Sequence, residues 1–233
     1  MVNPIREKND KLARLIAQRS GGIELGCGPF RAHPEFVGID LLDYECVDVV
    51  GEIFTVLATI PDGAVDCVHS SHFLEHLDNL DAMMREMSRV LKPGGEIIAV
   101  VPHFSNPYHY SDPTHRRFFG LYTMSYFATD RLFHRRVPNY FPDRSLELRD
   151  VKLGFRSPWK LRRALRLPFQ WLFNASRWLQ ELYEEFFTPF VYCFELRYVL
   201  ARTVNHADLQ QAGGAERDVG KVLRNLPHPA SVQ

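Results

Sequence analysis

The sequence predicts a single α/β domain built on a doubly wound, mostly parallel sheet, with an antiparallel last strand and a helical insertion before it. Over residues 21–101, short apolar segments that suit buried strands alternate with turns and one amphipathic helix. The segment 96–101 is a near-continuous apolar run, which is typical of a strand in the middle of a parallel sheet. At 233 residues and 45% hydrophobic content, the chain has room for one such domain with insertions.

The first half of the chain supplies most of the predicted sheet. Apolar residues at helical spacing predict a helix over 5–19, ended by two glycines, and another over 80–91, stopped by Pro93-Gly94-Gly95. The predicted strands cover residues 23–25, 36–40, 47–50, 64–68 and 96–101. Only residues 30–36 separate the first two strands, too few for a crossover helix, so we expect a turn there.

The second half predicts a different organisation. Residues 102–144 are rich in His, Pro, Tyr and Phe, as a substrate-facing loop would be. Segments 146–155 and 191–201 can form a pair of antiparallel strands. Between them, residues 159–187 carry aromatic and aliphatic side chains at helical spacing, which we interpret as core or dimer contacts rather than a ligand site.

Charge is distributed unevenly along a chain whose 28 basic and 28 acidic residues balance. Residues 21–90 contain 13 acidic and 3 basic residues, whereas residues 115–170 contain 4 acidic and 13 basic ones. Either solvated faces simply differ in sign, or the first block attracts a cationic ligand and the second an anionic one. The overall balance argues against a histone-like nucleic-acid binder.

A glycine loop follows the first predicted strand. Gly26 and Gly28 allow a close approach of the backbone to a ligand, although Arg31 replaces the third glycine of the dinucleotide fingerprint. Glu24, two residues before the loop, can attract a positively charged ligand, or it is an incidental strand carboxylate. Asp40 ends the second strand, where it can accept hydrogen bonds from ribose hydroxyls.

The string Glu24-Leu25-Gly26-Cys27-Gly28-Pro29 resembles motif I of class I S-adenosylmethionine-dependent methyltransferases, whose fold is Rossmann-like. Four further stretches resemble the same family in the right order. They are Asp40, Gly51-Glu52-Ile53, the turn and strand 61–66 with the loop 69–77, and the segment 89–95. The resemblance covers about residues 20–103 and implies S-adenosyl-L-methionine as cofactor, with S-adenosyl-L-homocysteine as product.

The resemblance also implies a set of cofactor-binding residues and a division of the chain. The implied contacts are Glu24, Gly26, Cys27, Gly28, Asp40, Leu41, Glu52, Ile53, Ser70, Ser71 and His72. One methyltransferase domain would span residues 1–203, followed by a loosely ordered tail over 204–233. Its parts would be a cofactor half (20–103), a substrate loop (104–145) and a helical lid or insertion (157–190).

Three histidines in the substrate loop are candidates for the general base of an O-methylation. A histidine with a pKa near neutral suits removal of a hydroxyl proton, and this loop lies beyond the carboxyl ends of the strands. We rank His115 first, His109 second and His103 third; the alternative is that they bind loop backbone. With Asp112 they match no metal-ligand spacing, so no metal site is expected. Asn106-Pro107-Tyr108 resembles a motif of amino-methylating enzymes but follows the wrong strand.

The stretch 159–167 is basic and amphipathic, so it can lie on an anionic membrane, cover an anionic substrate, or serve as a lid or dimer helix. Together with residues 112–127 it resembles small methyltransferases of bacterial polysaccharide and glycolipid biosynthesis. That resemblance implies O-methylation of a sugar on an anionic, nucleotide-linked or lipid-linked saccharide. Methylation of a neutral small metabolite and a non-catalytic adenosylmethionine-binding role are the alternatives. No nucleic-acid recognition module is present in the sequence.

The cysteines and the N-terminus indicate the compartment. Four cysteines without metal-ligand or disulfide spacing are interpreted as free thiols in a reducing environment. The N-terminal segment is too polar for a signal peptide, and no apolar run reaches the length of a spanning helix. We expect a cytoplasmic protein; peripheral contact with the inner membrane face and a homodimer both stay open.

Overall fold

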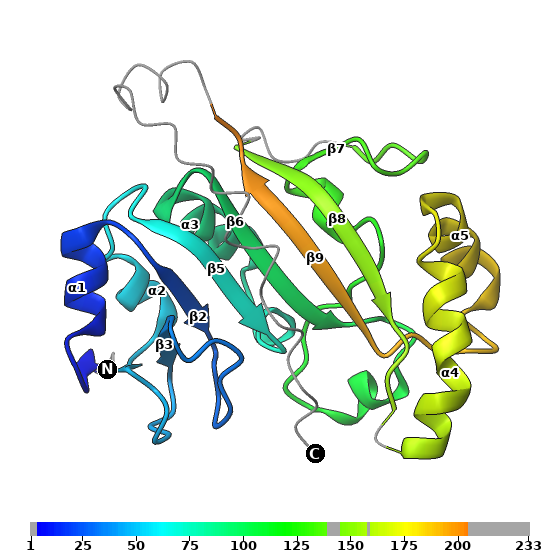
Figure 1. Ribbon diagram of the computed structural model, residues 1–233, viewed down its shortest axis with the longest axis horizontal. Helices are drawn as coiled ribbons and strands as arrows, with labels where there is room; N and C mark the ends of the chain where they lie inside the picture. The colour runs from blue at the N-terminus through cyan, green and yellow to red at the C-terminus, as the bar shows by residue number, and fades with distance from the viewer. Residues whose placement is uncertain (1–3, 139–144, 158, 205–233) are drawn as a thin grey trace.

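The computed structural model describes residues 4–138, 145–157 and 159–204. In these residues the chain forms a nine-stranded sheet in the order β1-β4-β3-β2-β5-β6-β9-β8-β7 (Figure 1). The strands are Arg6–Glu7 (β1), Gly22–Leu25 (β2), Val37–Asp40 (β3), Val49–Val50 (β4), Val65–Ser71 (β5), Leu91–Pro102 (β6), Thr129–Asp130 (β7), Leu146–Gly154 (β8) and Glu195–Arg202 (β9).

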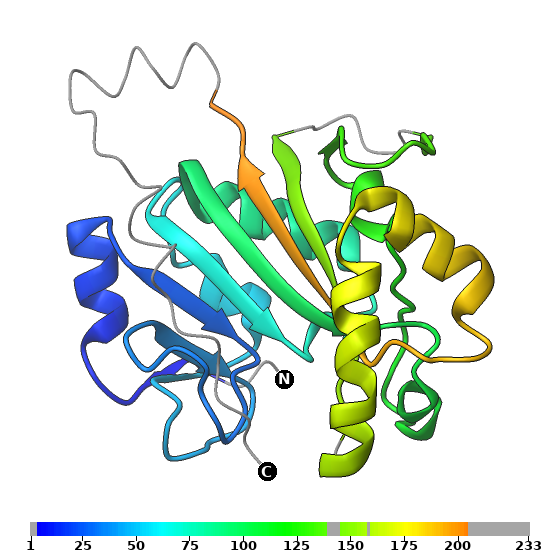
Figure 2. The same ribbon diagram turned by 45° about the vertical axis from the view of Figure 1, so that its right-hand side comes forward.

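Helical elements connect these strands and flank the sheet. The α-helices are Lys11–Gln18 (α1), Ile53–Leu57 (α2), Leu80–Val90 (α3), Lys160–Phe173 (α4) and Arg177–Leu182 (α5). Three 3-10 turns cover Leu74–His76 (η1), Pro107–Ser111 (η2) and Thr123–Tyr126 (η3), and a π-helical turn covers Tyr183–Phe187 (η4). Helix α3 lies behind β5 and β6, while α4 and α5 lie together beyond β8 (Figures 1 and 2).

The sheet confirms the predicted fold class. Strands β4, β3, β2, β5 and β6 are parallel, and β9 is antiparallel to both β6 and β8. Strand β2 pairs with β3 on one side and with β5 on the other, so the chain order reverses beside it. In open α/β sheets, ligands bind at such a switch point, outside the carboxyl ends of the strands.

Apolar burial fixes the centre of the sheet. All four residues of β2 are buried, and Ile97, Ala99 and Val101 of β6 are fully enclosed. Helix α3 packs its buried methionines and Val90 into the same core. Because this core encloses the central strands, it holds the strand ends in fixed positions, and the loops that follow them start from fixed points.

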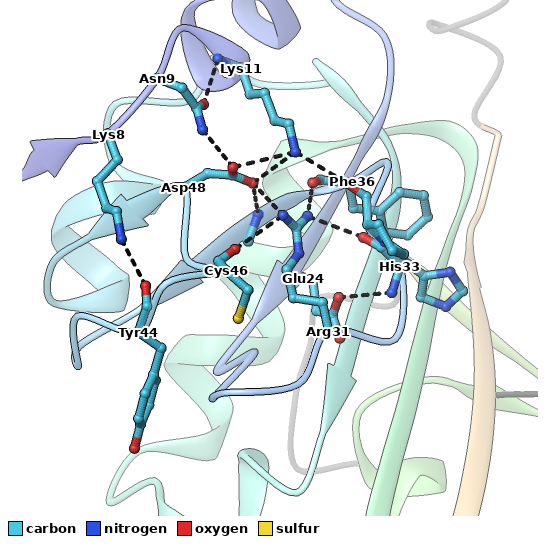
Figure 3. A network of polar contacts seen from close by, with 12 residues as sticks. Lys8, Asn9, Lys11, Glu24, Arg31, His33, Phe36, Tyr44, Cys46 and Asp48 are labelled. Carbon is cyan, nitrogen blue, oxygen red and sulfur yellow. Dashed lines mark hydrogen bonds and ion pairs between the residues drawn. The ribbon is translucent and has the colours of Figure 1, made fainter. Parts of the chain in front are cut away.

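A turn joins β2 to β3, as predicted, and a buried ion pair holds it in place of a helix. The guanidinium of Arg31 lies 2.7 Å from Asp48, and both side chains are largely buried (Figure 3). Arg31 also donates to the backbone carbonyls of Cys46, His33 and Phe36. The guanidinium fits against β3 because residue 38 is glycine, where a Cβ atom would lie 3.0 Å from Arg31 Nε.

Several predicted boundaries are wrong. Residues 6–7 form a strand beside β4, so the first helix begins only at Lys11. Helix α3 ends at Val90, and Pro93-Gly94-Gly95 lies inside β6, because backbone pairing at Leu91 already extends the sheet there. The predicted strand 47–50 shortens to Val49–Val50. Apart from Val204, the predicted tail lies outside the described residues, as does 139–144 of the substrate loop.

Of the two interpretations of the insertion's aromatic residues, core or dimer contacts, the core alternative is wrong for its tryptophans, and the dimer alternative stays a prediction. Trp171 and Trp178 are 78% and 66% exposed, whereas Phe173 and Tyr183 are buried. The difference follows from anchoring: Gln170 and Asn174 bind the backbone of residues 153 and 155, so only the adjacent side of α4 faces the body. No helix in the described part of the chain has the length and apolar character needed to span a bilayer.

Candidate functional site

The glycine loop lies at the carboxyl end of β2, at the switch point of the sheet. Gly26 and Gly28 both have left-handed backbone, with φ of 62° and 59°. The side chain of Phe73 lies against Gly26, where a Cβ atom would be 2.6 Å from its ring. A Cβ atom on Gly28 would meet nothing within 4 Å. Space for a ligand therefore lies in front of Gly28, and Phe73 closes the loop behind it.

Glu24 faces the turn after the glycine loop and binds the chain itself. Its carboxylate accepts hydrogen bonds from the backbone amides of Ala32 and His33 and lies 3.2 Å from His69 Nδ1 (Figure 3). Burial opposes its ionisation, but the bond with His69 and the two amides hold the pKa of Glu24 below its usual value. The Glu24 carboxylate thus stays ionised. Its hydrogen bonds fix the turn between β2 and β3, where a doubly wound fold usually has a helix.

Asp40 ends β3 beside the glycine loop. It accepts hydrogen bonds from the amides of Gly28 and Leu42, both at 2.8 Å. Leu41 extends into solvent, and its side chain is 55% exposed. Cys27 is buried, and burial together with the charge of Asp40 raises the pKa of its thiol to about 12, so it stays protonated. At this edge of the sheet, the loop backbone and the Asp40 carboxylate can bind a ligand, whereas the Cys27 thiol is buried and protonated.

Glu52 follows β4 and begins α2. Its carboxylate accepts hydrogen bonds from the amides of Phe54 and Thr55 and from the hydroxyl of Thr55. Burial opposes ionisation, but these donors hold the pKa of Glu52 below its usual value. Ile53 is buried beneath it. The structure therefore explains Glu52 as a helix cap, and leaves its carboxylate partly exposed at the same edge as Asp40.

The end of β5 carries Ser70, Ser71 and His72. Ser70 is fully buried, and its hydroxyl has no hydrogen-bond partner among the described residues. His72 has left-handed backbone with φ 52°, a conformation that non-glycine residues rarely adopt. Burial acts against its protonation, but hydrogen bonds to Glu195 and Glu75 raise the pKa of His72 to about 9. A cationic histidine therefore stands at the strand end next to the glycine loop.

Glu75 and His76 are candidate site residues within the stretch 69–77 that were not predicted from the sequence. Glu75 is fully buried, and its carboxylate pairs with His72. His72 Nδ1 lies 3.3 Å from one oxygen, and His115 Nε2 lies 3.9 Å from it. A buried carboxylate is costly even beside a cationic histidine, so its retention between His72 and His115 points to a functional role. Glu75 is recognised by its burial and not by its spacing in the sequence, so the sequence alone did not identify it.

The structure brings His109 and His115 together and packs them against η1. Their Nδ1 atoms are 3.1 Å apart, and His115 Nδ1 is 2.9 Å from the carbonyl oxygen of His109. A proton on His115 Nδ1 donated to that carbonyl leaves Nε2 unprotonated, facing Glu75 and, at 3.6 Å, Asp112. Burial and the neighbouring His115 lower the pKa of His109, which is almost fully enclosed.

His103 lies apart from this pair. It is fully buried at the end of β6, where its Nδ1 accepts a hydrogen bond from the amide of Ser105. Its Nε2 is 3.9 Å from Glu184 and has no hydrogen-bond partner among the described residues. The backbone-binding interpretation therefore accounts for Nδ1 of His103, and the ring is shielded from solvent.

Glu75, His76 and His115 are also the residues with donor atoms close enough to share a metal ion, within 4.8 Å of one another. His76 Nδ1 already contacts the hydroxyl of Thr114 at 2.9 Å. His72, held cationic next to Glu75, supplies positive charge to the carboxylate without a metal. The arrangement thus has its own counter-charge.

Comparison with known proteins identifies the class of the protein. A family model described as a methyltransferase domain matches residues 23–99, which hold the glycine loop, Asp40, Glu52, Glu75 and the strands β2 to β5. Residues 23–99 of the 233-residue chain therefore match a methyltransferase domain. The open space at Gly28 and the acidic residues ending β3 and following β4 suit the S-adenosylmethionine that the glycine-loop motif implies. No curated protein matches the chain.

Solved structures of similar fold include a SAM-dependent methyltransferase from Archaeoglobus fulgidus, with 18% identity and a TM-score of 0.49 over 82% of this chain and 92% of that one. A chain in the complex of the Haloferax volcanii Trm112 methyltransferase activator with a putative methyltransferase has 16% identity and a TM-score of 0.49, covering 84% and 90%. Phosphoethanolamine N-methyltransferase 2 from Haemonchus contortus, bound to S-adenosyl-L-methionine, has 14% identity and a TM-score of 0.46, covering 85% and 53%. These similarities carry no information on the acceptor.

Proposed function

We propose that this protein transfers the methyl group of S-adenosylmethionine to a hydroxyl of an anionic saccharide carried on a nucleotide or lipid diphosphate. The observation that supports it most is the His115–Glu75 pair at the strand edge, because it sets an imidazole nitrogen beside a buried carboxylate. A hydroxyl needs a proton acceptor as it attacks a methyl carbon, and a histidine backed by a carboxylate meets that need.

The cofactor lies across the switch point in this proposal. Gly26, Cys27 and Gly28 present backbone to its methionine end, with Glu24 holding the loop rigid from below. Asp40 and Leu41 receive the ribose, and Glu52 and Ile53 the adenine. Ser70, Ser71 and His72 form the wall at the end of β5, toward the acceptor. The cofactor half, substrate loop and insertion predicted from sequence keep these roles within one domain.

In the transfer step, the acceptor oxygen attacks the methyl carbon of the sulfonium in line with the C–S bond. The C–O bond forms, the C–S bond breaks, and its electron pair returns to sulfur, which leaves S-adenosylhomocysteine. The hydroxyl proton passes to His115 Nε2. Glu75 and Asp112, at 3.9 and 3.6 Å from that nitrogen, stabilise the imidazolium that forms. His109 ranks second because it is more enclosed, and His103 third because its ring is buried.

The proposed anionic acceptor depends on an arginine in the histidine loop. Arg116, next to His115, is exposed and forms a solvent-exposed ion pair with Asp78 at 3.2 Å, which a phosphate can displace. Arg131, Arg135 and Arg136 are also exposed, but they follow β7, which is level with the start of β6, so they lie away from the histidine loop. Guanidinium groups bind phosphate oxygens in a bidentate manner, so a phosphate-bearing acceptor would gain orientation as well as affinity.

A screen for S-adenosylhomocysteine release tests the proposal. The full chain is incubated with S-adenosylmethionine and a panel of sugar nucleotides, lipid diphosphate-linked saccharides, neutral glycans and neutral small alcohols. We expect release with a phosphate-bearing saccharide, and a KM for it that rises with salt and in Arg116→Gln. Turnover of a neutral metabolite alone would support the alternative acceptor class. Absence of cofactor binding by calorimetry with folded protein would contradict the enzyme assignment itself.

A further inference from the structure

We propose that the outer face of α4 binds the surface of an anionic phospholipid bilayer. We define the outer face of α4 by five residues: Leu161, Leu165, Pro168, Trp171 and Leu172. Their spacing of mostly three or four residues places them in one stripe along the helix. All five are exposed, and Leu161 and Trp171 are 75% and 78% exposed. A helix normally buries its apolar stripe against the body of the protein, but here that stripe faces away from it.

The opposite side of α4 is the one fastened to the body. Gln170 and Asn174 hydrogen-bond to the backbone of residues 155 and 153, and Phe173 is buried against Phe155 and Tyr183. Arg163 and Arg166 donate to carbonyl oxygens just before the helix, at Ser157 and Arg156. The orientation of α4 is therefore fixed by polar bonds, and it leaves the outer face available.

Exposed apolar side chains concentrate in this region of the chain. Of 17 large hydrophobic residues exposed in the described structure, ten lie between residues 159 and 190. All three tryptophans of the chain, Trp159, Trp171 and Trp178, are among them. Tryptophan is favoured at membrane–water interfaces, where its ring lies at the level of the head groups. An apolar concentration of this kind on a soluble surface marks an interaction site.

Charge favours a bilayer over a second copy of the chain as the occupant. Helix α4 carries Lys160, Arg162, Arg163 and Arg166 and no acidic residue, and its N-cap makes no side-chain hydrogen bond. Cations near a helix N-terminus oppose the helix dipole, so the free helix bears an electrostatic cost that an anionic partner removes. Pairing α4 with another copy would bring like charges together, whereas anionic lipids attract them.

A chain of contacts connects this helix to the proposed acceptor end of the site. The guanidinium of Arg166 lies 3.8 Å from the ring centre of Tyr192, whose ring centre is 6.4 Å from that of Tyr108 in η2. His109 is the next residue in η2. These contacts leave from the fastened side of α4, so they connect the helix to the histidine loop without turning the outer face toward it. The bilayer contact rests on the outer face alone and does not depend on the reaction.

Vesicle binding by the full chain tests the inference. Vesicles of phosphatidylcholine mixed with phosphatidylglycerol are compared with phosphatidylcholine alone, by co-sedimentation and by tryptophan emission. Because every tryptophan lies in the exposed region, we expect a blue shift and sedimentation with the anionic vesicles only. Lys160→Gln and Arg162→Gln should each weaken binding about fivefold. Leu165→Glu with Trp171→Glu should abolish it.

Val204→Glu is the matched control, since that apolar residue is 50% exposed but lies outside the insertion. It should bind anionic vesicles as the wild type does, and all variants should keep wild-type adenosylmethionine affinity as a sign of folding. Equal binding to neutral vesicles, or no binding by folded protein, would overturn the inference. So would a concentration-dependent dimer that Leu165→Glu dissociates, because a second copy would then cover the face. None of these outcomes depends on methyl transfer.

Discussion

The Nε2 atom of His115 lies 3.9 Å from a carboxylate oxygen of Glu75, a fully buried residue whose same oxygen lies 3.3 Å from His72 Nδ1. The two residues come from different parts of the chain, since Glu75 belongs to η1 after β5 and His115 to the loop after β6. Backbone bonds from Arg116 and Arg117 to the carbonyl of Glu75 hold the loop against η1. The pair is thus positioned by the fold rather than by a flexible loop.

Replacement of His115 by alanine should lower kcat at least about 100-fold, the usual contribution of a general base, with little change in adenosylmethionine affinity. Glu75→Gln, which keeps the shape of the side chain, should lower kcat while KM for the cofactor stays the same. Steady-state kinetics and cofactor calorimetry measure both. His134→Ala, an exposed histidine away from the strand edge, is the control. Wild-type kcat in His115→Ala would remove the base assignment.

The two glycines of the loop should respond differently to alanine. Gly28→Ala should cost about 1–2 kcal/mol for the left-handed backbone and weaken adenosylmethionine binding, because the added methyl occupies the open space. Gly26→Ala should destabilise the fold further, since its Cβ would clash with Phe73. Urea denaturation and calorimetry separate the two effects. Unchanged cofactor affinity in a folded Gly28→Ala protein would place the cofactor elsewhere.

The ion pair of Arg31 with Asp48 should make stability depend on acid pH. Burial opposes ionisation of Asp48, but the amide of Gly38, Asn9 and the cations Arg31 and Lys11 hold its pKa below the usual value. A carboxyl with a depressed folded pKa stabilises the fold above about pH 4, its unfolded value, and loses that contribution as pH falls toward the folded value.

Asp48→Asn should therefore lower the free energy of unfolding by about 3–5 kcal/mol at neutral pH, because it leaves a buried guanidinium unpaired. The difference from wild type should shrink below about pH 4. Urea denaturation at a series of pH values provides the measurement. A difference that stays constant through the acid range would show that the carboxylate's charge is not what stabilises the turn.

Chelation should leave the reaction intact. Glu75, His76 and His115 are close enough to share a metal ion, but the proposed step uses His115 Nε2 as a proton acceptor and His72 as the counter-charge of Glu75. Dialysis against a chelator should thus leave kcat unchanged, with or without added divalent cations. Loss of activity that a specific cation restores would reassign the three residues to a metal site.

The sequence predicted the fold class well because strand signals follow from local apolar patterns. The mostly parallel sheet, the turn after the glycine loop and the antiparallel β8–β9 pair are all present. The boundaries that failed depend on contacts made elsewhere in the chain. Residues 6–7 become a strand only because β4 offers an edge, and Pro93 lies in a strand because β5 pairs with its neighbour Leu91.

The site was predicted less completely, for a physical reason. Glu24 and Asp48 contribute to the acidic block of residues 21–90. In the structure, Glu24 accepts hydrogen bonds from backbone amides and Asp48 pairs with Arg31, so neither carboxylate is free to bind a ligand. Net charge along the sequence does not distinguish a satisfied carboxylate from an open one. Glu75 stood within a quoted motif, yet only its burial and the approach of His115 reveal it as a candidate.

The most direct test of the account is the chemical position of the transferred methyl group. S-adenosylmethionine carrying a labelled methyl group is incubated with the full chain and a lipid diphosphate-linked saccharide, and the product is examined by NMR and mass spectrometry. The account predicts a labelled methyl ether on a sugar oxygen, formed by the wild type and nearly absent with His115→Ala. A label on nitrogen or carbon, or equal product from both proteins, would contradict it.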